Sequence, residues 1–279
     1  MHNELDLDRY FARIGYRGPC TPTLDLLREL QRLHAQTIPF ENLDPLTGRR
    51  VSLDLAAVVD KLVERRRGGY CFEQNTLLAH VLMQLDFRVT PLIARVLWGR
   101  APDAVTPKTH MLLRVDFDDG PWMADVGFGA VTLTSPLRIV PGEPQQTTLE
   151  PFRLADASHG AFDLEIQTGD TWTKVYRFDL CRAEWIDYEV SNWFTSTHPA
   201  SFFTTDLVVT RVGRDGRTIL FDDRLTLRSK DGGVRERRIA DAHELAILLR
   251  DDFGIEVGNI DIAGVFARVK GRVPDFVKR

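Results

Sequence analysis

The sequence predicts an α+β fold, with a helical bundle first, a β-domain next and a mixed α/β segment last. Through the first 86 residues, apolar side chains recur at helical spacing. Near residue 87 the pattern changes to short runs rich in β-branched and aromatic residues, with turn signals between them. We therefore expect three domains, in residues 1–86, 87–190 and 191–279.

Helices are expected at four places in the first part. Their segments are residues 7–16, 21–38 and 52–66, and a segment that begins at Cys71. Pro22 and Thr23 are start signals for the second helix, and Ser52 is expected to cap the third. The fourth is expected to be amphipathic, because one face carries Leu78, Val81, Leu82 and Leu85.

Strands of the middle part are expected to pair antiparallel, in a sandwich or a barrel. Their segments are residues 88–99, 110–117, 121–129, 162–167 and 172–180. The chain then returns to helix in residues 182–194. Three strands with hairpin-like turns follow, in residues 206–213, 217–222 and 223–229. A last helix, residues 241–254, is expected to end at Gly254.

The composition is that of an ordinary globular protein, with 43% hydrophobic and 27% charged residues. The net charge of −4 gives no sign of binding to nucleic acid or to an anionic membrane. The charged opening, MHNELDLDRYFARIGY, lacks the apolar region of a signal peptide. No segment approaches the roughly 18 apolar residues of a spanning helix. We expect a cytoplasmic protein.

The three cysteines, Cys20, Cys71 and Cys181, are too few and too scattered for a disulfide framework. No C-x-x-C or H-E-x-x-H spacing occurs, so no metal site is expected. Cys20 and Cys181 are expected to be small buried hydrophobic residues, the usual role of an isolated cysteine.

Cys71 has different surroundings, in the segment RRRGGYCFEQN (65–75). The glycine pair allows a sharp turn and close approach by another group. A helix that begins here places its positive N-terminal end at the sulfur, which favours a thiolate. A free thiol has a pKa of about 8.5, and helix N-termini and nearby cations lower it. This placement favours a nucleophilic role for Cys71.

A nucleophilic thiol needs a base, and the base needs an orienting group. His110 lies where a loop enters a strand, and Asp125 ends the next strand. The short turn DDGP separates these strands, so a hairpin would bring the imidazole and the carboxylate together. Judged from local sequence alone, six other histidines could equally be the base: His2, His34, His80, His159, His198 and His243. Spacing alone therefore leaves the triad open.

Five segments together resemble the arylamine N-acetyltransferase family, in its bacterial branch. They are TIPFENLD (37–44), RRRGGYCFEQN (65–75), THMLL (109–113), ADVGFG (124–129) and NWFTSTHPASFF (192–203). The resemblance implies a helical bundle, a central antiparallel β-barrel and a C-terminal α/β lid, the first two forming a papain-like core. It also implies acetyl transfer from acetyl-CoA to an arylamine or arylhydrazine.

The resemblance carries roles to individual positions. Cys71 matches the acetylated nucleophile, His110 its base, and Asp125 the group that orients the histidine. Residues expected to contact CoA are Gly127, Gly129 and Thr109. Residues expected to line the acceptor pocket are Phe40, Phe128 and Phe203, although phenylalanines are often plain core. Arg67 and Glu41 match a structural salt bridge of the family.

The implied mechanism is ping-pong through an acetyl-cysteine, with acetyl-CoA as cosubstrate and no metal. The expected partners are small molecules, without nucleic acid or membrane, and a homodimer is left open. One rival is a cytosolic thiol hydrolase, an amidase or thioesterase, on the same core. The other is a non-catalytic protein that binds CoA or aromatic compounds.

Overall fold

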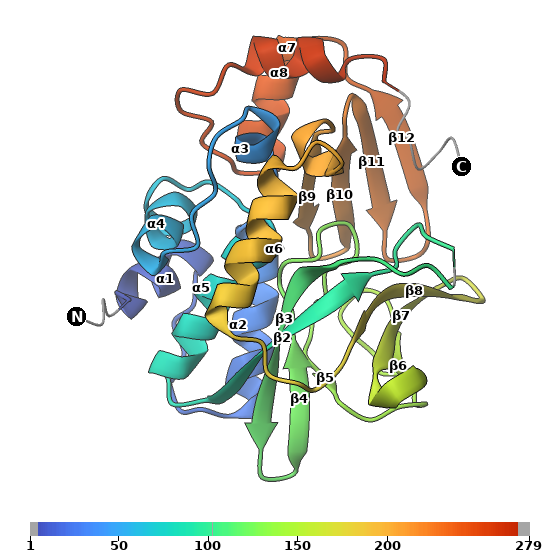
Figure 1. Cartoon of the computed structure of the whole chain (residues 1–279). Coiled ribbons are helices and arrows are strands. Elements are labelled where there is room, and N and C mark those ends of the chain that lie inside the picture. Colours follow the sequence, from blue (N-terminus) through green and yellow to red (C-terminus); the bar gives the residue numbers. More distant parts are fainter. Residues whose placement is uncertain (1–4, 102, 273–279) are drawn as a thin grey trace.

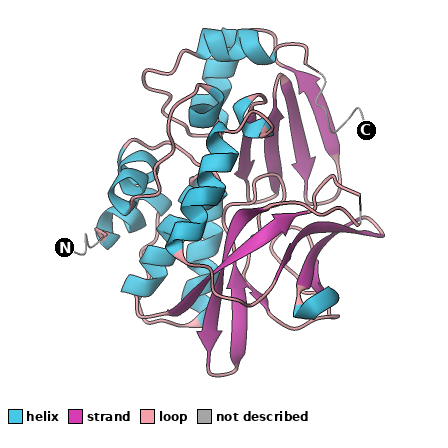
Figure 2. Ribbon diagram, in the orientation of Figure 1, coloured by secondary structure: helices cyan, strands magenta, loops and turns pink. Residues whose placement is uncertain are grey.

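The computed structural model describes residues 5–101 and 103–272 (Figure 1). Helices gather on one side of the molecule and two sheets on the other (Figure 2). The order of elements confirms the predicted α+β fold, with helices first, antiparallel strands next and a mixed segment last. In the ranges just given, no helix combines the length and the apolar character that crossing a membrane requires.

The first part contains α1 (Leu7–Ile14), α2 (Leu24–Thr37), α3 (Leu43–Leu46), α4 (Leu55–Val59) and α5 (Cys71–Gln84). The predicted start of α2 is confirmed, since the Thr23 hydroxyl accepts a hydrogen bond from Leu26 N. The predicted third helix was too long. The observed helix begins at Leu55 and ends in a π-helical turn, Asp60–Glu64. The Ser52 hydroxyl does not cap it, but accepts a hydrogen bond from Asp54 N before the helix begins.

Helix α5 begins at Cys71 as predicted, but it is not amphipathic. Almost every side chain from Cys71 to Leu82 is buried, on all sides of the helix. The buried faces include polar side chains of the first two turns, among them Glu73 and Asn75, which are hydrogen-bonded inside the protein. The helix packs against strands of the middle part and against α4, so it forms the centre of the molecule.

The middle part is a nearly closed barrel of seven antiparallel strands, which decides between the two predicted alternatives. The strands are β2 (Arg88–Val96), β3 (Lys108–Phe117), β4 (Gly120–Ala124), β5 (Leu137–Arg138), β6 (Phe152–Asp156), β7 (Phe162–Thr168) and β8 (Thr171–Phe178). Their order in the sheet is β5-β4-β3-β2-β8-β7-β6. Bridges from Pro141 to Leu154 and from Gln145 to Phe152 connect the two edges. The sequence pattern had missed the short β5 and β6.

The last part contains α6 (Trp185–Thr197), a 3₁₀ turn (Phe202–Thr204), and α7 (Ala242–Ile247), which continues in a π-helical turn to Asp252 and stops at Gly254 with φ +71°. Its sheet has the order β1-β9-β10-β11-β12. These strands are β1 (Phe40–Glu41), β9 (Val208–Val212), β10 (Gly216–Phe221), β11 (Arg224–Ser229) and β12 (Val234–Arg238). Strand β12 and helix α8 (Ile262–Val269) had not been predicted.

Strand β1 lies in the first part of the chain but pairs with β9 in the last. Next to it, the buried Asn42 side chain joins the same two parts. Its Nδ2 donates to the carbonyls of Phe203 (2.8 Å) and Asp206 (2.7 Å), and its Oδ1 accepts from Val208 N (2.7 Å). Helix α6 also spans residues 190 and 191, where a domain boundary had been expected. The three-domain division stays a prediction.

Replacing Asn42 by Ala should lower the free energy of unfolding by about 2–4 kcal/mol, because two carbonyls and one amide lose a buried partner. Urea unfolding followed by circular dichroism measures this change. Asn259→Ala is the matched control, since the exposed Asn259 side chain accepts from Arg49 Nη1, while its backbone carbonyl keeps the bond from Arg49 Nη2. Equal effects of the two changes would contradict a joining role for Asn42.

Candidate functional site

Cys71 is the first residue of α5, and only 4% of it is exposed. Its Sγ lies 3.6 Å from the carbonyl oxygen of Thr109. Gly68, three residues earlier, allows the chain to pack closely against Pro39, because a Cβ there would lie 2.2 Å from the carbonyl oxygen of Pro39. The backbone therefore brings the sulfur to the start of a buried helix and against the barrel.

The hairpin predicted from the DDGP turn is confirmed, with β3 and β4 antiparallel and Leu113 opposite Ala124. It brings His110 on β3 close to Asp125, which follows β4. His110 Nε2 lies 2.8 Å from Asp125 Oδ2. The Cys71 thiol lies close enough to the imidazole to help raise its pKa. The structure thus brings the three predicted side chains into one chain of contacts.

The Asp125 carboxylate is fully buried and has four hydrogen-bond donors. They are His110 Nε2 (2.8 Å), Asn75 Nδ2 (2.9 Å), Gly127 N (2.8 Å) and the Tyr176 hydroxyl (3.0 Å). Burial raises the pKa of this carboxyl, but His110 and the other donors outweigh burial and leave the pKa lowered. Asp125 is therefore held as an anion.

The same contacts act in the opposite direction on the imidazole. Burial lowers the pKa of His110, but the Asp125 carboxylate and the neighbouring Cys71 outweigh burial and raise the pKa to about 10. A protonated imidazole beside the sulfur stabilises a thiolate. The surroundings therefore favour a protonated imidazole next to Cys71.

Asn75 and Tyr176 belong to this site, although sequence reasoning did not single them out. Asn75 lies one turn after Cys71 on α5. Its Nδ2 also donates to Met111 O (2.7 Å), and its Oδ1 accepts from Val126 N (3.1 Å), so it joins α5 to the barrel. Asn75 is part of the segment RRRGGYCFEQN (65–75). Its position four residues after Cys71, on the same face of the helix, could have indicated that it belongs to the site. Tyr176 comes from β8, far along the chain, and gave no local signal.

The three predicted pocket phenylalanines form two separate contacts. The Phe128 ring lies edge-on to the His110 ring at 5.1 Å and contacts Tyr176 at 5.4 Å. Phe40 and Phe203 contact each other at 5.9 Å, and Phe203 also meets the Tyr70 ring edge-on. Phe128 and Phe203 are only partly buried, whereas Phe40 is 6% exposed. Their pocket role stays a prediction.

The backbone amides of Gly127 and Gly129 both donate hydrogen bonds to other groups of the protein. Gly127 N donates to Asp125, and Gly129 N donates to the Thr132 hydroxyl at 2.7 Å. A Cβ on Gly127 would lie 2.7 Å from Cys71 Cα, so glycine is needed there for close packing against α5. Any contact of these glycines with CoA would rest on close approach of the backbone, because these amides already have partners.

The expectation that the other two cysteines are buried was wrong. Cys20 and Cys181 are exposed, so they are not buried hydrophobic residues.

Among the other histidines, His34 is buried as His110 is, but its ring nitrogens lie 2.9 Å from the Tyr10 hydroxyl and 2.7 Å from Gln74 Oε1. His2 falls outside the described residues. Across residues 5–101 and 103–272, no group of three or more His, Cys, Asp or Glu side chains could hold a metal ion.

A family model described as N-acetyltransferase matches residues 23–262. The arylamine N-acetyltransferase of Mycobacterium tuberculosis is 47% identical over 264 residues, which cover 93% of each chain. The chain belongs to the arylamine N-acetyltransferase family. The family member of Escherichia coli is 38% identical over 252 residues, covering 90% of this chain and 89% of the relative.

Solved structures of arylamine N-acetyltransferases have the same fold. The Mycobacterium tuberculosis structure matches with a TM-score of 0.90 and 46% identity, over 95% of this chain and 99% of that one. The Mycobacterium marinum structure in complex with CoA matches with a TM-score of 0.90 and 42% identity, over 95% and 98%. These matches confirm both the resemblance and the expected fold class.

The raised pKa of His110 predicts a pH dependence of stability. The ordinary pKa of 6.5 rises to about 10 in the fold, so the stability that this shift contributes is complete below pH 6.5 and is lost as the pH rises through about 10. The difference in unfolding free energy between the wild type and His110→Gln should therefore shrink between these pH values. Urea unfolding at several pH values measures it, with exposed His243→Gln on α7 as control. A constant difference would contradict a charged His110.

Proposed function

We propose that this chain transfers the acetyl group of acetyl-CoA to arylamines and arylhydrazines, through an acetyl thioester on Cys71. The observation that carries the proposal is the contact of Cys71 with the buried His110–Asp125 pair, at the start of α5. Family membership supports the reaction class, and the matching Mycobacterium marinum structure is a complex with CoA.

In the first half-reaction, Cys71 Sγ attacks the carbonyl carbon of the acetyl thioester. His110, protonated beside the sulfur, gives its proton to the departing CoA sulfur. The oxyanion that forms needs hydrogen-bond donors close to Cys71. The first amides of α5, those of Cys71 and Phe72, have no partner within the helix and suit this role.

In the second half-reaction, the amine nitrogen attacks the acetyl-Cys71 carbonyl. His110 accepts the proton that the nitrogen loses, and the Cys71 sulfur leaves as a thiolate, which restores the ion pair. Asp125 keeps the imidazole oriented and stabilises its charge in both steps. An arylamine is largely neutral near pH 7, whereas an alkylamine such as lysine has a pKa of about 10.4 and is mostly protonated. Weakly basic amines are therefore the preferred acceptors.

Three features of the chain remain predictions. The cytoplasmic setting rests on the composition of the chain. The homodimer also stays a prediction, because the structure is that of a single chain. The contacts of Thr109, Gly127 and Gly129 with CoA rest on the family resemblance and on the position of these residues beside Cys71 and its partners.

Mixing the protein with acetyl-CoA in the absence of an amine should add one acetyl group, and peptide mapping should place it on Cys71. Intact-protein mass spectrometry measures the addition, and Cys71→Ala should abolish it without unfolding the protein. Exposed Cys20 and Cys181 serve as internal controls. An acetyl group on either of them, with Cys71 unmodified, would overturn the assignment. Release of CoA at the same rate with and without an arylamine would favour the rival hydrolase.

Phe128→Ala should lower kcat/KM for the arylamine by about tenfold or more, because an aromatic pair contributes about 0.5–1.5 kcal/mol beyond the burial of its area. The rate of acetyl-Cys71 formation should change much less. Phe162→Ala, which removes a partly buried ring elsewhere in the barrel, is the control for lost packing. If both half-reactions slowed equally, Phe128 would act by orienting His110, whose ring it contacts.

A further inference from the structure

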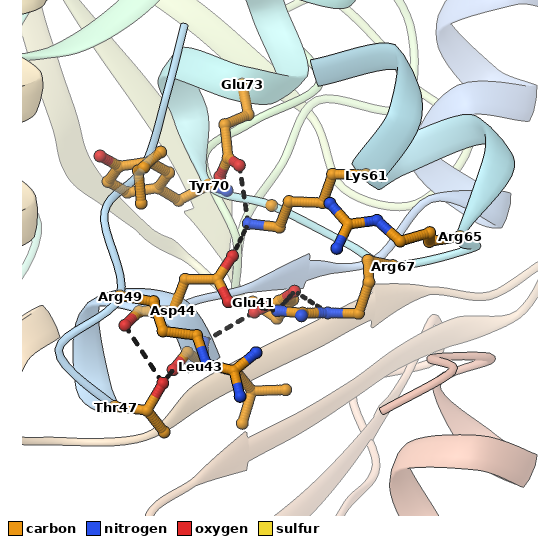
Figure 3. A network of polar contacts seen from close by, with 12 residues as sticks. Glu41, Leu43, Asp44, Thr47, Arg49, Lys61, Arg65, Arg67, Tyr70 and Glu73 are labelled. Atoms are coloured by element: carbon orange, nitrogen blue, oxygen red, sulfur yellow. Dashed lines mark hydrogen bonds and ion pairs between the residues drawn. The ribbon is translucent and has the colours of Figure 1, made fainter. Parts of the chain in front are cut away.

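Five buried ionic side chains meet beside the start of α5 (Figure 3). They are Glu41 on β1, Asp44 on α3, Lys61 on the π-helical turn, Arg67 on the following loop, and Glu73 on α5. Each is less than a tenth exposed. We name these five residues the ionic cluster. With three carboxylates and two cations, the cluster depends on each of its cations to balance buried negative charge.

The ionic cluster has two halves. Arg67 pairs with Glu41 at 2.6 Å and with Asp44 at 3.2 Å, and the first of these is the salt bridge that the family resemblance had implied. Lys61 pairs with Asp44 at 2.6 Å and with Glu73 at 2.7 Å. The second half reaches the helix that carries Cys71.

Glu73 uses its two oxygens for different partners. Oε1 accepts from Lys61, and Oε2 accepts from the backbone amide of Tyr70 at 3.1 Å. Tyr70 is the residue before Cys71, so this bond fixes the backbone where α5 begins. Lys61 is therefore connected to Cys71 through one carboxylate and one peptide unit.

The carboxylate can hold this position only while a cation balances it. Burial raises the pKa of Glu73, and Lys61 opposes that rise. Burial lowers the pKa of Lys61, but Glu73, Glu41 and Asp44 outweigh burial and raise it. Without Lys61, the buried Glu73 would take up a proton or move toward water. Either change weakens the acceptor that Tyr70 N has now.

We propose that Lys61 is a positioning residue for Cys71, acting through Glu73 on the backbone of Tyr70. The proposal rests on the proposed role of Cys71 as the nucleophile. A displacement of the sulfur by about 1 Å relative to His110 can cost about a hundredfold in rate. A cation that keeps the first turn of α5 in place therefore controls the reactivity of the thiol without touching it.

Three titratable groups interact electrostatically with the Cys71 thiol. They are His110 from β3, Tyr70 from the preceding residue, and Tyr188 from α6. The ionic cluster lies on the other side of Tyr70, beyond its backbone amide. Lys61 forms no ion pair with His110 or Tyr188, so a change in thiol reactivity after its removal would report the position of the helix start and the charge behind it.

The test compares Lys61→Met with Lys174→Met. Lys174 forms an ion pair with Asp163 at 2.8 Å on the barrel, so its loss controls for a missing ion pair alone. Both proteins are first shown to be folded by circular dichroism. Alkylation of Cys71 by iodoacetamide is then followed by peptide mass mapping as a function of pH, together with single-turnover acetylation by acetyl-CoA.

Lys61→Met should slow both reactions of Cys71 by about tenfold or more and move the pH midpoint of alkylation upward, whereas Lys174→Met should leave both within about twofold. The double variant Lys61→Met with Glu73→Gln should recover most of the rate. The amide oxygen introduced by Glu73→Gln would still accept from Tyr70 N, and no unpaired charge would remain. A folded Lys61→Met with wild-type reactivity overturns the proposal, and so does a double variant as slow as the single one.

A second pair of variants keeps the test decisive if Lys61→Met does not fold. Glu73→Gln retains an acceptor for Tyr70 N, and Glu73→Met does not, while Lys61 stays paired with Asp44 in both. Glu73→Gln should keep the alkylation rate within about threefold and Glu73→Met should lose about tenfold. Equal rates overturn the proposal. Alkylation needs no acetyl-CoA, so a wild type that is alkylated but never acetylated would refute the proposed function separately.

Discussion

The buried carboxylate of Asp125 is the constraint on which the rest of the site depends. A charge without access to water requires a full set of donors, and Asp125 takes them from α5, β3, β8 and its own loop. These elements can satisfy the carboxylate only when the central helix, the hairpin and the far strand of the barrel are all in place. Assembly of the reactive centre and packing of the core are therefore one event.

Cys71 lies between two clusters of buried charge with different tasks. On the barrel side, the buried Asp125 carboxylate holds the His110 imidazole next to Cys71. On the other side, the ionic cluster holds the backbone from which the sulfur projects. The first cluster is near the reacting atoms, and the second is separated from them by a peptide unit. Such a division allows a rigid support without an additional charge in contact with substrate.

Local patterns in the sequence were enough to predict the start of α5, the hairpin that carries His110 and the order of the elements. These features depend on neighbours within a few residues, such as the glycine pair before Cys71. Tyr176 could not be predicted, because its contact with Asp125 depends on barrel closure over 51 residues. The burial of Lys61 was hidden for the same reason, since its partners come from α3 and α5. The exposure of Cys20 shows that residue type alone does not determine burial.

The pairing of β1 with β9 has a consequence for synthesis on the ribosome. Asn42 and β1 leave the ribosome early, but their partners near Val208 are made 166 residues later. At about 5–20 residues per second, this interval lasts roughly 8–33 s. During it the nascent helical part carries an unpaired strand edge and an Asn42 side chain whose later partners are missing. The first third of the chain can therefore become compact early, but it reaches its final structure only when the last third has emerged.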